Sequence, residues 1–244
     1  MASRKRPAAP AAPADSSTAR RRHRVAAGAA APAVVVAQAP PPAAPAGELP
    51  RCSWAATDAR LRAYHDEEWG QPVRCPKRLF EVLSLCTQQA GVSWRIVWAK
   101  REAYRAAFHG LELERVAAMS DDDVERILAD PGHAVIKNRR KLCAIVANAK
   151  VLREVDRSHP GGLSAFLWGF CPAGEPIVND ELLTHDNAHL RANESHLSRS
   201  LTARLKGELG LRFLGSITLH AFAQQCGLIN DHCRTCFLNP RSRA

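Results

Sequence analysis

The chain has 244 residues and a formal net charge of +10. No stretch approaches 18 consecutive apolar residues, so we expect no membrane span, and about 190 residues are enough for one sizeable core. A basic balance suits a polyanionic partner such as nucleic acid, although a merely soluble basic surface explains the charge equally well. The eight cysteines form no compact disulfide pattern, which favours a reducing compartment where thiols serve the core or a metal.

Residues 1–50 differ in composition from the rest of the chain. They are rich in Ala and Pro, contain no aromatic residue, and hold seven Lys or Arg against two acidic residues, a net charge of +5. Such a segment buries too little apolar surface to offset its chain entropy, so we predict a disordered tail before a domain at 51–244. Its RKR and RRRHR clusters suit a nuclear signal, but the acid-poor composition also fits a transit peptide to a mitochondrion or plastid.

Four candidate metal ligands stand at the two ends of the domain. Cys52 and His65 lie near its start, and His232 and Cys236 near its end. A Cys₂His₂ set completes a tetrahedral shell for Zn²⁺ and leaves no open position, so such a site is structural. His232 and Cys236 stand four residues apart, the spacing that directs two side chains to the same face of a helix, and Cys233 is then a spare thiol. Core cysteines and surface histidines are the alternative.

Helical periodicity dominates the domain from residue 77 onward. Apolar positions recur at helical spacing in 77–90 and 93–108, an acidic run opens a helix at 121–128, and 138–155 is a long amphipathic stretch. A short apolar helix follows at 163–170, and 179–195 is typical of a polar loop. No strand-rich region is present, so the fold class that we predict is all-α.

Two helices joined by a glycine-bearing turn are predicted near the end of the domain. The turn carries Gly210 and Gly215, and the second helix begins at Ser216. Unpaired N–H groups at a helix N-terminus bind phosphate, and Lys206 and Arg212 add positive charge nearby. Turns of this kind are usually structural, so the pattern alone is a weak indication of DNA binding.

An ordered set of motifs resembles the DNA-3-methyladenine glycosylase I family of the helix-hairpin-helix superfamily. The matching stretches are RCSW (51–54), YHDEEWG (64–70), LFEVL (79–83), QQAGVSW (88–94), KREAYRAAF (100–108), IKNRRK (136–141), LRFLGSIT (211–218) and GLINDHCRTC (227–236). The resemblance implies an all-helical, monofunctional enzyme of base-excision repair that hydrolyses the N-glycosidic bond of alkylated purines, chiefly 3-methyladenine. It also implies one structural zinc on the four ligands above, double-stranded DNA as partner and a monomer.

The resemblance assigns roles to several further residues. Tyr64 and Trp94 match aromatic residues that line the pocket for the extruded base. Trp69 matches a tryptophan of the family's HDxEWG motif, and packing in the core is the alternative role. The loop of Gly91 and Val92 matches the wedge that fills the gap left in the duplex. The helix pair joined by the glycine-bearing turn, with Lys206, Gly210, Arg212 and Gly215, is the expected DNA contact.

Two positions depart from the family pattern. Where the family has the glutamate that recognises the base, this chain has Cys86, and where it has a second aromatic residue, this chain has Leu61. A neutral thiol is a poor hydrogen-bond acceptor, so we expect lesion specificity to be altered or weakened. Asp231 is a candidate for stabilising the oxocarbenium-like sugar; orienting His232 or capping a helix is the alternative.

Three functions fit these features. The first is an alkylbase DNA glycosylase, and the second is a glycosylase-like DNA-binding protein with altered specificity or little activity, because Cys86 replaces the recognition glutamate. The third is a zinc-containing helical domain that binds RNA or another partner. Retention of the wedge and aromatic motifs favours the first two.

Overall fold

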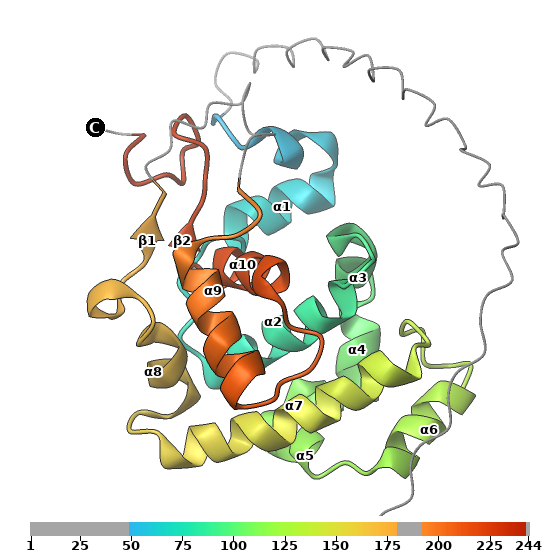
Figure 1. Cartoon of the computed structure of the whole chain (residues 1–244). Helices are drawn as coiled ribbons and strands as arrows, with labels where there is room; N and C mark the ends of the chain where they lie inside the picture. Colours follow the sequence, from blue (N-terminus) through green and yellow to red (C-terminus); the bar gives the residue numbers. More distant parts are fainter. Residues whose placement is uncertain (1–48, 180–191, 243–244) are drawn as a thin grey trace, which may run out of the picture. The chain divides into compact units, whose positions relative to one another are not determined.

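A computed structural model describes residues 49–179 and 192–242, so the predicted tail lies almost wholly outside the described residues, as does most of the polar loop predicted at 179–195. The described elements are predominantly helical (Figure 1). In chain order they are η1 (Ser53–Thr57), α1 (Ala59–Glu67), α2 (Pro76–Gln89), α3 (Trp94–Ala99), α4 (Arg101–Ala107), η2 (His109–Leu111), α5 (Leu113–Ala117), α6 (Asp121–Ala129), α7 (Arg139–Ser158), α8 (Gly162–Trp168), η3 (Pro172–Gly174), β1 (Ile177–Val178), α9 (His196–Thr202), η5 (Ala203–Glu208), α10 (Ser216–Gln225) and β2 (Ile229–Asn230).

Helix α2 is central to the core. Pro76 occupies its first turn, where a missing N–H costs nothing, and every residue from Leu79 to Gln88 is buried. It packs against α3, α7, α8 and α10, and Figure 1 shows it surrounded by these helices. A helix that is buried on nearly all sides fixes the positions of the elements around it.

The long helix α7 and the acidic helix α6 begin at side-chain caps. Asn138 accepts a hydrogen bond from the N–H of Lys141, and Ser120 and Asp123 form a capping box at the start of α6. Both helices match the residues predicted for them to within a few positions. None of the helices within the described residues is both long and apolar enough to span a bilayer.

Two details differ from the sequence prediction. The stretch 93–108, predicted as continuous, is two helices, because the backbone turns at Lys100 (φ −102°, ψ 8°) and its N–H closes the last turn of α3. A two-stranded parallel pairing, Ile177 with Ile229 and Val178 with Asn230, is added to the helical fold. It joins segments about fifty residues apart and leaves the helical fold class unchanged.

The predicted helix pair is formed by α9 with its π-helical extension η5, a turn, and α10. The turn is fixed by buried Asn148 of α7, whose side chain accepts from the N–H of Arg212 (2.7 Å) and donates to its carbonyl (3.1 Å). Both backbone groups of Arg212 are thus held by one amide, and its side chain is exposed.

The two ends of the domain lie side by side. The N–H of Phe237 donates to the carbonyl of Pro50 (2.8 Å), and Arg51 forms a two-point ion pair with Asp66. The first and last described segments therefore meet around α1, where the four candidate ligands lie.

Candidate functional site: a metal cluster beside an aromatic cavity

The four candidate ligands converge on one buried point. The ligand atoms of Cys52, His65, His232 and Cys236 all lie within 4.8 Å of one another. Cys236 Sγ is 3.4 Å from His65 Nε2 and 3.5 Å from His232 Nδ1, and Cys52 Sγ is 3.7 Å from His232 Nδ1. This arrangement brings two sulfur and two nitrogen donors together and could hold a metal ion. His232 and Cys236 lie in turns after β2 and not on a helix, so helical spacing does not account for their convergence.

The outward-facing atoms of the cluster are held by neighbouring groups. His65 Nδ1 pairs with Asp66 (2.8 Å), His232 Nε2 faces the carbonyl of Trp69 (3.2 Å), and the N–H of Cys233 donates to Cys52 Sγ (3.3 Å). Such contacts fix the ring orientation and tautomer of metal-bound histidines. The donor set and its supporting hydrogen bonds therefore suit a closed structural site.

Gly70 makes room for one of the ligands. A Cβ atom at this position would lie 2.6 Å from His232 Nε2, and the backbone has a φ of +78°, which disfavours any side chain. The glycine that ends the YHDEEWG motif thus allows the imidazole to sit directly against the backbone of the turn after α1.

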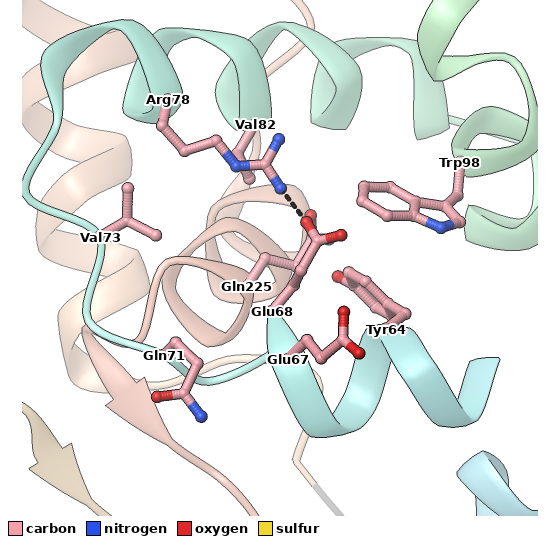
Figure 2. A pocket seen from close by; sticks show the side chains of 9 residues that line it. All are labelled: Tyr64, Glu67, Glu68, Gln71, Val73, Arg78, Val82, Trp98 and Gln225. Atoms are coloured by element: carbon pink, nitrogen blue, oxygen red, sulfur yellow. Dashed lines mark hydrogen bonds and ion pairs between the residues drawn. The ribbon is translucent and has the colours of Figure 1, made fainter. Parts of the chain in front are cut away.

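Helix α1 connects the cluster to a cavity. Tyr64 and His65 are the buried residues of this short helix, and His65 belongs to the Cys/His cluster while Tyr64 lines a cavity of about 140 Å³. Figure 2 shows the nine side chains around this cavity. They are Tyr64, Glu67, Glu68, Gln71, Val73, Arg78, Val82, Trp98 and Gln225.

Tyr64 and Trp98 form the aromatic wall of the cavity, with ring centroids 4.5 Å apart. Trp94, predicted to line the pocket, lies one layer behind, 6.1 Å from Tyr64 and 5.8 Å from Trp98. Trp98 was not predicted to line the pocket, although it stands four residues after Trp94 and so shares its helix face. Trp69 packs edge-on against His232 (4.6 Å) and does not contribute to the lining of this cavity.

The polar side of the cavity is charged. Glu68 points into the space between Arg78 and the aromatic wall (Figure 2), and it is paired with Arg78 and with Arg101 (3.1 Å). Arg101 also lies over the Trp98 ring, 4.4 Å from its centroid. Glu68 therefore supplies a carboxylate at the cavity whose orientation is fixed by two guanidinium groups.

Glu81 anchors this charge network from the core. Its carboxylate contacts Arg78 (2.9 Å), Arg101 (2.8 Å) and Arg105 (2.8 Å), and its side chain is 4% exposed. Burial alone would raise the pKa of Glu81, but hydrogen bonds from Arg105 and Arg78 and the charge of Arg101 outweigh burial and hold its pKa below the usual value.

Cys86 does not line the cavity. Its side chain is fully buried beneath Gln225, and its thiol donates to Gln225 Oε1 over 3.7 Å. Burial raises the pKa of the Cys86 thiol, so this group stays neutral. Gln225, which the sequence analysis did not single out, lines the cavity in front of it.

The structure places Asp231 and Leu61 outside the cavity lining. Asp231 is buried, and its carboxylate accepts hydrogen bonds from the side-chain amides of Asn179 and Gln224. These contacts connect the end of β1, α10 and the turn before ligand His232. Leu61 is half-buried on α1. The sugar-stabilising role assigned to Asp231 stays a prediction.

The predicted wedge lies at the C-terminal end of α2. Gly91 is exposed with a φ of +73°, and Val92 is half-buried. Buried Lys141 donates to the carbonyls of Gln88 (2.8 Å) and Ala90 (2.6 Å), which holds the start of this loop in place. The loop is thus fixed at its base and open at its tip.

A basic hollow of about 450 Å³ lies beside the turn of the helix pair. It is lined by Arg139, Arg140, Cys143, Arg212 and Phe213, and the Arg140 guanidinium lies 5.9 Å from the Phe213 ring centroid. The first two arginines were not predicted as site residues; they belong to the motif IKNRRK at the start of α7.

The remaining predicted DNA contacts surround the same turn. Lys206 and Gly210 are exposed, and half-buried Gly215 is the N-cap of α10. Together with Arg212 they place positive charge and free helix N–H groups at one end of the pair, as phosphate binding requires.

Comparisons with known proteins agree with this architecture. A family profile described as methyladenine glycosylase matches residues 54–239. DNA-3-methyladenine glycosylase 1 of Escherichia coli (strain K12) is 36% identical over 195 residues, covering 80% of this chain and 100% of that protein. The DNA-3-methyladenine glycosylase of Haemophilus influenzae is 36% identical over 188 residues, covering 76% and 96%.

Solved structures of similar fold are also 3-methyladenine DNA glycosylases. A 3-methyladenine DNA glycosylase I from Staphylococcus aureus has a TM-score of 0.70 and 33% identity, covering 78% of this chain and 96% of that one. A crystal structure of a 3-methyladenine DNA glycosylase I in complex with 3-methyladenine also has a TM-score of 0.70, at 33% identity with 78% and 97% coverage. The helical fold predicted from the sequence is confirmed, and the chain belongs to the methyladenine glycosylase family.

Proposed function

We propose that this chain is a monofunctional DNA glycosylase that releases alkylated purines, chiefly 3-methyladenine, from double-stranded DNA as the first step of base-excision repair. The observation that carries the proposal is a cavity that combines an aromatic wall, Tyr64 and Trp98, with the carboxylate of Glu68. Relatives of this chain are named for the same activity, which supports the substrate class.

The cavity suits a base extruded from the stack. A flat ring held against Tyr64 and Trp98 recovers part of the stacking energy that flipping costs. N3-alkylation gives the adenine ring a positive charge, and Glu68 can accept hydrogen bonds from its amino group while favouring that charge. Glu68 thus offers the acceptor that Cys86, buried behind Gln225, does not.

The reaction needs little acid catalysis from the protein. The bond between the purine nitrogen and C1′ of the sugar breaks, and its electron pair goes to the base, which leaves as a neutral molecule. The oxygen of a water molecule bonds to C1′, and a water proton is released to solvent. Orientation of the base and electrostatic stabilisation of the separating charges are then the main contributions of the site.

The basic hollow and the wedge loop are the surfaces through which the cavity would be held against DNA. Arg139, Arg140 and Arg212 are exposed cations at one hollow and would neutralise backbone phosphates, while Gly91 and Val92 would enter the stack beside the flipped base. Phosphate contacts of this kind position the duplex without reading its sequence.

We further propose that the buried cluster holds structural Zn²⁺. The donors Cys52, His65, His232 and Cys236 match the sulfur and nitrogen preference of zinc, and the supporting hydrogen bonds described above suit a metal-bound state. When bound, the ion would fasten the two ends of the domain together and hold α1, and with it Tyr64, in position. Metal content measured by mass spectrometry, with about one zinc per chain expected, tests the assignment.

The function is tested by chromatography of free bases released from methylated duplex DNA. We expect free 3-methyladenine from the wild-type protein, and a loss of about tenfold or more in Tyr64→Ala, because one face of the aromatic wall is removed. Cys86→Glu introduces the glutamate that the family has at this position, and its base release is compared with that of the wild type. Wild-type protein that binds this DNA without releasing a base would contradict the proposal and favour a DNA-binding role.

A further inference from the structure

Lys141 is a buried cation in the first turn of α7. Its side chain is 6% exposed, whereas the two residues before it, Arg139 and Arg140, are exposed and line the basic hollow. The ammonium donates to the carbonyls of Gln88 (2.8 Å) and Ala90 (2.6 Å) at the C-terminal end of α2. Burying an ammonium is costly unless acceptors replace water, so these two carbonyls allow the charge to lie inside the fold.

These contacts complete the C-terminal end of α2. The last carbonyls of a helix have no partner within it and form the negative end of its dipole, which favours a cation there. The lysine binds the carbonyls of Gln88 and Ala90, and the N–H of Val92 donates to the carbonyl of Gln89 (2.8 Å). Each carbonyl from Gln88 to Ala90 is therefore hydrogen-bonded, and the backbone that leads into the wedge loop is fixed.

The connection between α2 and α7 is reciprocal. The side-chain amide of Gln88 donates to the carbonyl of Lys141 (3.1 Å), in return for the bond from the ammonium to its own carbonyl. The Tyr104 hydroxyl contacts Gln88 Oε1 (3.4 Å) and accepts from the N–H of Ile136 (3.2 Å). A buried polar network whose members have partners is rigid. The base of the wedge loop is thus held by α4, by α7 and by the segment that precedes α7.

The tip of the wedge loop has no such support. Gly91 is exposed with a φ of +73°, and a Cβ atom there would meet nothing within 4 Å among the described residues. A loop with a fixed base and an open tip suits insertion into another molecule, because the cost of ordering it is met before binding. The same turn of α7 carries Arg139 and Arg140, so Lys141 connects the wedge loop to the basic hollow.

We propose that Lys141 is a positioning residue that holds the wedge loop ready for insertion and sets its place relative to the phosphate contacts of Arg139 and Arg140. The DNA feature recognised in this way is the gap that an extruded or missing base leaves in a duplex. This inference rests on the proposed glycosylase function, in which Gly91 and Val92 form the wedge. Lys141 itself does not bind phosphate, because its ammonium is buried against two carbonyls.

The experiment compares affinities for two duplexes of the same sequence, one undamaged and one with a tetrahydrofuran abasic-site analogue, over a range of salt concentrations. The wild type should prefer the analogue. In Lys141→Met, which keeps the stem of the side chain and removes the ammonium, this preference should fall about tenfold, because the wedge loop loses two hydrogen bonds from a charged donor. Affinity for the undamaged duplex and its salt slope should be unchanged, because no phosphate contact is lost.

Lys137→Met is the matched control. Lys137 belongs to the same IKNRRK motif and also donates to two main-chain carbonyls, those of Ile127 and Asp130, but these lie at the end of α6. Its substitution should leave the preference within about twofold of wild type. Lys141→Gln keeps a donor for one carbonyl and should lower the preference about threefold. This variant decides the result if melting curves show that Lys141→Met does not fold.

A spectroscopic signal separates positioning from a general loss of stability. 2-Aminopurine placed opposite the abasic-site analogue fluoresces more strongly when an inserted side chain unstacks it. At saturating protein, the wild type and Lys137→Met should give the full increase, and Lys141→Met a smaller one. A folded variant that was only less stable would give the full increase at saturation.

The outcomes separate the inference from the function on which it rests. The inference is overturned if folded Lys141→Met keeps the wild-type preference and fluorescence, or if Lys137→Met loses both equally. A salt slope lowered by about 1 in Lys141→Met would mean direct phosphate contact and would also overturn it. Wild type that releases 3-methyladenine but binds both duplexes equally overturns the inference alone, whereas wild type that releases no base contradicts the proposed function.

Discussion

The Cys/His cluster and the cavity share helix α1 but differ in how their polar atoms are hydrogen-bonded. Around the cluster, the polar atoms have hydrogen-bonding neighbours. His65 Nδ1 pairs with Asp66, His232 Nε2 faces the carbonyl of Trp69, and Cys52 Sγ accepts from the N–H of Cys233. At the cavity, the Tyr64 hydroxyl is buried without a hydrogen-bond partner among the described residues. Since an unpaired buried polar atom costs free energy, the first pattern is typical of a structural site and the second of a binding site.

The largest effect is expected from breaking the cluster. Cys52→Ser should abolish stoichiometric zinc and lower the free energy of unfolding by more than about 5 kcal/mol, because a structural metal joins segments that are distant in sequence. Calorimetry should then show a melting temperature at least about 10 °C lower. Cys75→Ser, at an exposed cysteine, is the control and should change neither metal content nor melting temperature. Retained zinc and stability in Cys52→Ser would show that the four residues are not a metal site.

Glu81→Gln should have the next largest effect, because it leaves three arginines facing a neutral side chain in the core. We expect a loss of about 3 kcal/mol at neutral pH. A carboxyl whose pKa is lowered on folding stabilises the protein above its unfolded pKa, near 4.5, and this contribution is lost as pH falls through the lowered folded value. Denaturant titrations of both proteins should therefore converge at acidic pH. A difference independent of pH would contradict this account.

Gly70 and Gly91 have similar backbone conformations but different surroundings. Substituting each in turn distinguishes the cost of a steric clash from the cost of an unfavourable φ. Gly70→Ala should cost about 2–3 kcal/mol and weaken zinc binding, since its Cβ would meet the His232 ring. Gly91→Ala has a comparable φ but nothing within 4 Å, so we expect about 1 kcal/mol and normal zinc. Equal losses from the two substitutions would mean that Gly70 does not serve the cluster.

Substitutions at the basic hollow should change the free energy of unfolding least. Their main effect should be on DNA binding. Arg140→Ala or Arg212→Ala should weaken binding to duplex DNA of any sequence and reduce the slope of log affinity against log salt by about 1 for each arginine. Arg157→Ala, near the other end of α7, is the control. An unchanged salt slope in both hollow variants would place the DNA surface elsewhere.

Much of this architecture could be predicted from the sequence. The four candidate ligands could be named from the sequence, and the acidic run, the amphipathic spacing and the glycine-bearing turn located α6, α7 and α10. Local patterns could not give the break at Lys100 or the pairing of β1 with β2, because both depend on the packing of distant segments. For the same reason the sequence analysis assigned the pocket to Trp94 rather than Trp98, and missed that Gln225 covers Cys86.

The most direct test of the central claim is the release of free 3-methyladenine from methylated duplex DNA by zinc-loaded wild-type protein, measured together with abasic sites in the same DNA. We predict equal amounts of free base and abasic sites, at least about tenfold less of both with Tyr64→Ala, and no change with Cys75→Ser. Folded, zinc-loaded protein that releases no base would contradict the assignment of the cavity as a lesion-binding active site.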